Sequence, residues 1–314
     1  MLFYPLHHNF RHKSQLSSTR LRRIALPIAA VMLSTIVTAR VQAATLRVAP
    51  SSPQPGDILT LTVYPSPGET ISGLSMSAFD TPEVKFYGKS DGTARSFVGL
   101  PFDRHGGTFS LKALVNVTRD GRVAQTTLST RFIARERVFP TQHISMKSST
   151  ASKMSEKAAF AAEKARVQST MKNSYPGALW QGNWIVPAQG ASTSSYGRRR
   201  YVNGHWWGQH NGADVKAQTG TPVRAANSGR VVLSEYLPTL RGNCIVVDHG
   251  CNVFSIYMHL SKSLVNVGQS VAKGQVIGRV GATGFVTGPH LHWEVRIGWE
   301  PVDPNHVVQY GLNF

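Results

Sequence analysis

Cysteine is scarce in this sequence of 314 residues, which contains only Cys244 and Cys251. Two cysteines cannot form the disulfide framework that stabilises small secreted domains, and they are too few ligands for a zinc ribbon. They flank residues 245–250, an apolar run ending in His-Gly that predicts a hairpin. In such a hairpin one cysteine lies at the turn and the other further back along a strand, so we expect two free thiols.

Acidic residues are also few. The chain has 16 Asp and Glu against 34 Lys and Arg, which gives a net charge of +18. Residues 1–43 hold six of the basic residues and no acidic one, and the remainder still carries +12. This balance favours an anionic partner, either nucleic acid, a membrane surface or an acidic polymer such as cell wall. Simple solubility would explain it equally well, so charge alone does not choose among them.

Long apolar runs are absent except at residues 24–37. This run follows Arg22-Arg23 and precedes Val-Gln-Ala at residues 41–43, a small-x-small cleavage pattern. We therefore predict a signal peptide over residues 1–43, with export to the periplasm, the cell envelope or the exterior. The run is short for a membrane span and contains Pro27. The long basic leader leaves an uncleaved N-terminal anchor, or peripheral membrane association, as an alternative.

Residues 44–136 contain no cluster of catalytic residue types. Residues 59–63 and 109–117 alternate between apolar and polar positions as half-buried strands do, and Asp120-Gly121 is typical of a tight hairpin turn. Short strands at this spacing predict a β-sandwich of immunoglobulin type. We expect a structural or targeting module here, in preference to a second enzyme.

Residues 137–183 form a predicted linker. Within it, residues 153–171 are rich in good helix formers and follow a Ser/Thr-rich stretch that can cap a helix. We expect this linker helix to pack lightly on a neighbour through a thin apolar stripe. The stripe consists of Ala158, Ala161, Ala162 and Ala165.

Helical periodicity is missing from residues 184–314. Strand-like runs at 231–233, 245–247 and 254–257 are separated by glycines, as in a compact antiparallel sheet with tight turns. The chain as a whole is therefore predicted to be mainly β, with an N-terminal sandwich, a linker helix and a C-terminal antiparallel domain. We expect the basic run at 198–200 to lie in a solvated loop.

Two histidines stand two residues apart in this last segment. In a strand, His290 and His292 point to one face and Leu291 to the other. Two such imidazoles are more often ordinary surface residues than a site, so partners must come from elsewhere. His210 and Asp214 flank an Asn-Gly pair, which favours a turn over a helix and could bring both side chains to one point.

Together, His210, Asp214 and His292 would offer two imidazoles and a carboxylate. This set suits zinc, and three protein ligands leave a fourth position for water, as in catalytic sites. Zinc can lower the pKa of such a water to about 7. His259 and His290 remain to accept a proton and to stabilise an oxyanion. Taken singly, each histidine is as readily explained as a core or surface residue.

The segment from about residue 179 to residue 304 resembles the lysostaphin-type (LytM-like) zinc metalloendopeptidases. The resemblance rests on stretches that occur in order along the chain. They are residues 194–199 (Ser-Ser-Tyr-Gly-Arg-Arg), His210-x-x-x-Asp214, residues 220–226, 229–232, 248–250, 257–261 (Tyr-Met-His-Leu-Ser), 274–278 and 284–294, which contain Gly-Pro-His-Leu-His-Trp-Glu.

The resemblance implies that His210, Asp214 and His292 bind Zn²⁺ and that His259 and His290 are catalytic without binding it. We assign His290 as the general base and His259 as the transition-state stabiliser. The implied fold is an antiparallel β catalytic domain of the lysostaphin/LytM type (duplicated hybrid motif) with an open groove. Trp206 and Trp207 could line this groove and pack on the substrate, with ordinary rim packing as an equal alternative.

The predicted domains are therefore 1–43, 44–136, 137–183 and 184–314. The function that the resemblance implies is an exported zinc metalloendopeptidase that hydrolyses peptide bonds in peptidoglycan cross-links or stem peptides. Some relatives have lost zinc ligands, so the alternative is an inactive wall-binding or amidase-activating protein on the same fold. Retention of all five residues favours the enzyme. Nucleic-acid binding is disfavoured, since no aromatic-basic pattern supports it.

Overall fold

The computed structural model describes residues 43–146 and 156–312. The expected signal peptide lies outside the described residues apart from its last position. Among the residues described, no helix is both long enough and apolar enough to cross a membrane.

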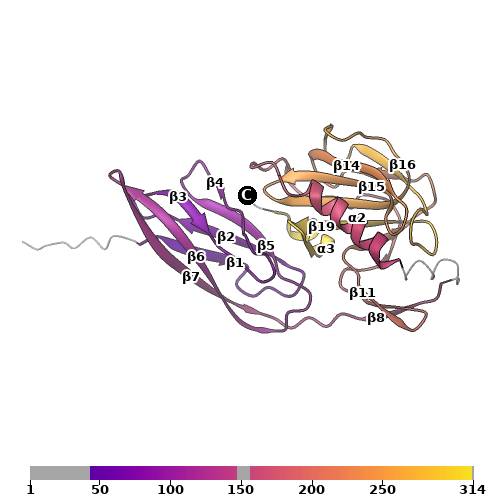
Figure 1. Cartoon of the computed structure of the whole chain (residues 1–314), viewed down its shortest axis with the longest axis horizontal. Coiled ribbons are helices and arrows are strands. Elements are labelled where there is room, and N and C mark those ends of the chain that lie inside the picture. The colour runs from indigo at the N-terminus through magenta and orange to yellow at the C-terminus, as the bar shows by residue number, and fades with distance from the viewer. Residues whose placement is uncertain (1–42, 147–155, 313–314) are drawn as a thin grey trace, which may run out of the picture. The chain divides into compact units, whose positions relative to one another are not determined.

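The first part of the chain forms two antiparallel sheets (Figure 1), with strand orders β1-β2-β5-β4 and β3-β6-β7. Leu59 and Leu61 of β2 share one buried core with Leu111 and Val115 of β6, so the two sheets pack face to face as the predicted sandwich. Leu114, the apolar residue on the outward face of β6, is 41% exposed. The strands are β1 (Thr45–Ala49), β2 (Ile58–Tyr64), β3 (Thr70–Ser75), β4 (Tyr87–Gly88), β5 (Ala94–Gly99), β6 (Gly107–Arg119) and β7 (Arg122–Ala134).

The predicted linker contributes a strand and a helix, β8 (Thr141–Ile144) and α2 (Lys157–Thr170). Strand β8 pairs in parallel with β10 (Arg199–Val202), so this part of the linker joins a sheet of the C-terminal region. The four alanines of the predicted stripe are all exposed, and the buried side chains of α2 are Glu163 and Val167. The helix is confirmed but the face it buries was wrongly predicted, because alanine offers too little area to hold a helix against a sheet.

The C-terminal region is built on a ten-stranded sheet whose main path runs β17-β14-β15-β16-β19-β12-β9. Helix α2 lies across it (Figure 1), and Val167 of this helix packs with Leu233 of β14 and Phe254 of β16. The elements are β9 (Ala191–Ser194), β10 (Arg199–Val202), β11 (His205–Gln209), β12 (Ala213–Lys216), β13 (Pro222–Arg224), β14 (Gly229–Leu237), β15 (Gly242–Gly250), β16 (Val253–Ser263), β17 (Ser270–Val271), β18 (Val276–Val280), β19 (His290–Ile297), β20 (Glu300–Val302) and α3 (Pro304–Tyr310).

Helix α3 was missed by the sequence reasoning, which found no helical segment after residue 184. It has only seven residues, too few for a visible period. Its start is nevertheless marked in the sequence, since Asp303 caps it by accepting a hydrogen bond from the Asn305 amide and Pro304 follows at the first turn. Cys244 and Cys251 are both free, as expected, and the structure buries both of them.

The β15–β16 turn is covered by the end of the linker. The amide of Cys251 donates to the Tyr175 carbonyl, and the amide of Leu179 donates to the His249 carbonyl. Gly250 lies in this contact at φ +85°, and a Cβ there would stand 1.8 Å from the Gly177 oxygen. The turn therefore has no room for a side chain on this side.

We predict that Gly250→Ala destabilises the protein by roughly 3 kcal/mol, because the strain of a left-handed residue adds to overpacking against the linker. Gly220 is the matched control, since it has φ +92° but nothing within 4 Å of its missing Cβ. Gly220→Ala should therefore cost only the backbone strain, about 1 kcal/mol. Urea unfolding measures both. Equal losses would contradict the close packing of residues 175–179 on the turn.

Candidate metal centre and active site

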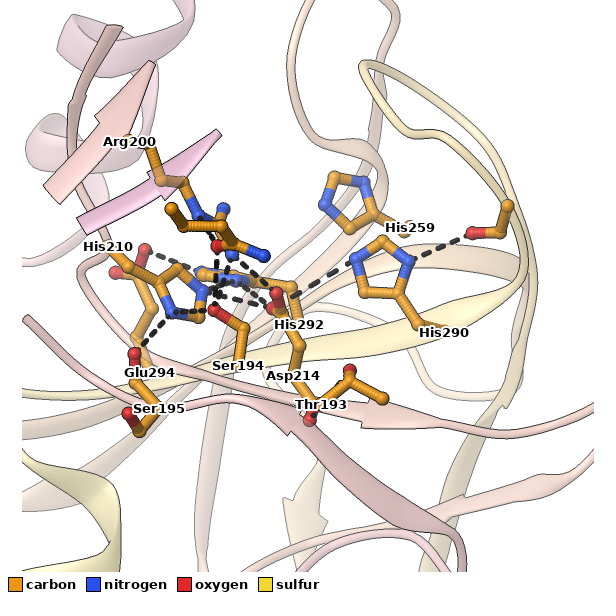
Figure 2. Close-up of polar contacts among 12 residues, drawn as sticks. Thr193, Ser194, Ser195, Arg200, His210, Asp214, His259, His290, His292 and Glu294 are labelled. Atoms are coloured by element: carbon orange, nitrogen blue, oxygen red, sulfur yellow. Dashed lines mark hydrogen bonds and ion pairs between the residues drawn. The ribbon is translucent and has the colours of Figure 1, made fainter. Parts of the chain in front are cut away.

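Three buried side chains bring their donor atoms together at one point (Figure 2). Strand pairing places Asp214 of β12 directly opposite His292 of β19, and His210 lies in the turn that follows β11. His210 Nε2 is 3.0 Å from Asp214 Oδ1 and 2.9 Å from His292 Nδ1. Asp214 Oδ1 is 2.8 Å from His292 Nδ1. The structure thus brings the three predicted ligands together.

The second nitrogen of each ligand imidazole faces an acceptor. His210 Nδ1 is 2.8 Å from the Ser195 carbonyl oxygen, and His292 Nε2 is 3.1 Å from Glu294 Oε1. Since a carbonyl and an ionised carboxylate can only accept, these nitrogens carry the ring hydrogens. The lone pairs of His210 Nε2 and His292 Nδ1 therefore point at each other and at Asp214, as in sites where the outer partner orients a ligand histidine.

Asp214 is ionised at this point. Burial alone would raise the pKa of its carboxyl group, but the polar contacts with the His210 and His292 rings hold that pKa far below its usual range. Its second oxygen, Oδ2, accepts a hydrogen bond of 2.6 Å from Arg200 Nη2. The prediction of a solvated basic loop is therefore wrong for Arg200, which lies on β10 and is only partly exposed.

Glu294 and Arg296 extend the network behind His292. The guanidinium of Arg296 donates to Glu294 Oε2, and both side chains are buried. The sequence reasoning gave neither residue a role, nor did it give one to Arg200. Glu294 had a usable signal, because it follows His290 and His292 at the two-residue period that keeps strand side chains on one face. Arg200 had none, since its contact depends on how β10 is placed in the fold.

The donor set fits a divalent cation. Two lone pairs and a carboxylate oxygen at 2.8 to 3.0 Å from one another repel unless a positive charge lies among them. Burial lowers the pKa of His210 to about 4. Burial would also lower the pKa of His292, but hydrogen bonding to Asp214 and Glu294 raises this pKa to about 9. Without a metal, a second proton on the His292 ring can therefore supply the positive charge. Ligands of tetrahedral zinc at about 2.0–2.1 Å stand roughly 3.3 Å apart, so a small outward shift of the three atoms would admit the ion.

His259 and His290 lie beside this centre without joining it. The ring centroids of His259 and His290 are 4.9 Å apart, and His290 Nε2 is 3.9 Å from Asp214 Oδ1. His259 Nδ1 is 3.0 Å from the Thr283 carbonyl oxygen, and His290 Nδ1 is 2.9 Å from that of Gly288. Burial lowers the pKa of both rings, that of His259 most strongly. Both are neutral near pH 7, with Nε2 left to accept a proton.

All five residues line one open cavity of about 520 Å³. Trp207 lines it as well, stacked on Phe285 with ring centroids 4.9 Å apart. Trp206, the second aromatic predicted for the groove, is 52% exposed and packs edge-on against Tyr201. The structure thus brings Trp207 to the predicted groove and leaves Trp206 outside its lining.

A buried His-Asp-His cluster beside two neutral imidazoles, on the antiparallel sheet of a mainly β chain, has the composition of a catalytic metal site. Comparison with known proteins gives the family. Residues 208–304 match the model described as "Peptidase family M23". The chain therefore contains a domain of peptidase family M23, joined to an additional N-terminal β region.

Curated relatives match in the same region. The peptidoglycan DD-endopeptidase ShyA of Vibrio cholerae is 47% identical over 94 residues, which cover 30% of this chain and 22% of that protein. The DD-carboxypeptidase/endopeptidase Mpg of Neisseria meningitidis is 42% identical over 116 residues, 37% of this chain and 26% of that protein. The chain thus spans about a quarter of the length of these relatives.

One solved structure shares the wider fold. A Pseudomonas aeruginosa protein described as a peptidase M23 superposes with a TM-score of 0.56 at 23% identity, covering 82% of this chain and 94% of that one. This likeness concerns the fold alone. It supports the mainly β architecture, with β sheets ahead of the M23 domain.

We predict that Zn²⁺ added to the metal-free protein raises its unfolding temperature, because an ion that binds only the folded chain stabilises it by about 2.7 kcal/mol at one hundred times its dissociation constant. His210→Ala and His292→Ala should abolish the shift. His205→Ala is the control, since that imidazole is exposed on β11 and lies outside the cluster. Calorimetry with and without zinc tests this, and a full shift in either ligand variant would refute the ligand set.

Proposed function

We propose that this chain is an exported zinc metalloendopeptidase that hydrolyses peptide bonds in peptidoglycan cross-links or stem peptides. The observation that carries the proposal is the convergence of His210, Asp214 and His292 within 3.0 Å of one another, with two further neutral imidazoles in the same cavity. A closed structural metal site would need neither the cavity nor the extra imidazoles.

His210 Nε2, Asp214 Oδ1 and His292 Nδ1 would hold the zinc. When bound, such an ion supplies Lewis acidity for the scissile carbonyl and lowers the pKa of a water beside it to about 7. The fixed ring hydrogens of His210 and His292 keep both lone pairs directed at the ion. Arg200 and Arg296 balance the carboxylates of Asp214 and Glu294, so the cluster stays ordered despite its buried charge.

His290 acts as the general base in this proposal. Its Nδ1–H donates to the Gly288 carbonyl, so Nε2 is free to take a proton from the attacking water and later deliver it to the leaving amine. Asp214 Oδ1 is 3.9 Å from Nε2 and stabilises the imidazolium that forms.

His259 steadies the oxyanion. Its Nδ1 is held by the Thr283 carbonyl, so Nε2 is the atom that it can present to the cavity. The negative charge that develops beside Nε2 favours the protonated ring despite its burial, and Nε2 then donates a hydrogen bond to that charge. Trp207 would line the groove beside the substrate, and Trp206 would contact it from the rim.

The names of the relatives support the substrate. Both aligned proteins carry an endopeptidase name, and that of ShyA specifies peptidoglycan. Peptidoglycan is outside the cytoplasm, so this substrate agrees with the export pattern at residues 1–43. We therefore propose a location in the periplasm, the cell envelope or the exterior. The basic charge suits an anionic wall. We propose that the N-terminal sandwich is an immunoglobulin-like module that targets the M23 domain, spaces it or blocks its groove.

Mass spectrometry of muropeptides, after digestion of peptidoglycan by the protein without residues 1–43, tests the function. We expect cleaved cross-link or stem peptides from the wild type, and none from His210→Ala or His292→Ala. His205→Ala should release them at the wild-type rate. A protein that binds the wall and zinc but releases no peptide would instead be a non-catalytic wall-binding or activator protein.

The division of roles between His259 and His290 has its own test. Both alanine variants should keep zinc and lose roughly 10²–10⁴ in kcat. A glutamine places an N–H donor near the position of the histidine Nε2 but cannot accept a proton. His259→Gln should therefore retain roughly tenfold more activity than His259→Ala, whereas His290→Gln should be as inactive as His290→Ala. The reverse pattern in steady-state kinetics would exchange the two roles.

A further inference from the structure

A buried carboxylate on helix α2 binds a loop that forms one wall of the active-site cavity. Glu163 is 6% exposed, although it belongs to the predicted linker. Its oxygens accept hydrogen bonds from three consecutive backbone amides: Thr239 at 2.6 Å, Leu240 at 3.1 and 3.2 Å, and Arg241 at 3.3 Å. The Arg241 guanidinium stands 3.5 Å away. These donors compensate the desolvation of the charge and fix the β14–β15 loop to the helix.

The far side of the same loop holds His259. The His259 amide donates to the Arg241 carbonyl at 2.8 Å, and the Phe285 amide donates to the Leu240 carbonyl at 2.9 Å. Leu240 and Arg241 line the cavity together with His259. The peptide unit between Leu240 and Arg241 thus donates its N–H to Glu163 and accepts at its C=O from the loop after β18, and the next peptide unit accepts from His259.

His259 needs this support because its backbone is strained. It lies within β16 at φ +63°, in the left-handed region that a histidine adopts at a cost. Residues in such conformations persist when the surrounding structure fixes them, and they concentrate at functional sites. Two hydrogen bonds fix His259, one from its amide to Arg241 and one from its ring to Thr283. The first of these depends on the loop that Glu163 holds.

We propose that Glu163 is a positioning residue for His259. It acts from helix α2, outside the segment 208–304 that matches the family, and it sets the direction in which His259 Nε2 enters the cavity. This inference rests on the proposed role of His259 in hydrolysis. It gives one side chain of α2, that of Glu163, a role at the active site, while the rest of the helix only packs on the sheet.

The test compares three variants of the full chain on muropeptides. Glu163→Gln keeps the size of the side chain but directs an NH₂ group toward amides that need an acceptor. Val167→Ala loosens the same helix, since Val167 is fully buried against the sheet, without touching the loop. Glu235→Gln removes an exposed carboxylate that pairs with Arg166 of the helix. We expect Glu163→Gln to lose tenfold or more in kcat with zinc content and KM unchanged. Val167→Ala and Glu235→Gln should remain within twofold of the wild type.

A double-mutant cycle identifies the route of the effect. If Glu163 acts through His259, Glu163→Gln should cost little further activity in a His259→Gln background, because residues that act as a unit are not additive. Wild-type kcat in Glu163→Gln, equal losses in Glu163→Gln and Val167→Ala, or full additivity in the cycle would each overturn the proposal. If Glu163→Gln fails to fold, Glu163→Asp replaces it in the same comparison. This variant keeps the carboxylate but moves it away from the loop amides, because the aspartate side chain is shorter.

A spectroscopic readout separates this inference from the function itself. The Nδ1 proton of His259, held by the Thr283 carbonyl, should give a downfield NMR signal that is lost in His259→Gln. We expect the signal to shift or broaden in Glu163→Gln and to persist in Val167→Ala. An unchanged signal in Glu163→Gln would overturn the positioning role. Absence of peptide release by the wild type would refute the hydrolytic function while leaving this measurement interpretable.

Discussion

A single buried negative charge organises the C-terminal region. Asp214 is 6% exposed, and an ionised carboxylate in such a place is costly unless several groups compensate it. His210 and His292 approach one oxygen and Arg200 binds the other. Each of these comes from a different strand or turn, so the charge is satisfied only when β12 and β19 pair in register and β10, from a separate sheet, lies beside them. The metal centre can therefore form only when these strands are correctly arranged.

Side chains alternate between the two faces of β19, and this alternation separates the core residues from the polar network. Leu291 and Trp293 enter the core, while His292 and Glu294 lie on the opposite face with the polar network. This part of the site could be predicted from the sequence, because a two-residue period involves only neighbouring residues and the His-x-His pattern contains it. The convergence of His210 and Asp214 with this face was predicted through the family resemblance. Spacing alone allowed a turn but could not place it opposite β19.

What sequence reasoning missed has a common cause. Arg200 reaches Asp214 from a sheet in which β10 pairs in parallel with β8, whose residues lie 58 positions earlier in the chain. Glu163 binds amides 76 to 78 positions away. Neither contact leaves a periodic trace in the sequence. The alanines of α2 do form a periodic pattern, but the face that they predicted to be buried is exposed. A pattern of small apolar residues shows which face could be buried, and it does not show that the loop beside the helix needs a carboxylate, which Glu163 supplies.

These contacts bear on where the catalytic unit begins. Gln142, Ile144 and Met146, from β8 and its continuation, line the cavity, and Gln142 accepts a hydrogen bond from Arg200. Residues 174–179 cover the β15–β16 turn, and Glu163 binds the loop behind His259. The segment between sandwich and M23 domain thus contributes at three separate points, each with buried or cavity-lining groups. A flexible spacer would bury none of them, so the physical unit that shapes the groove begins at β8, upstream of the residues that match the family.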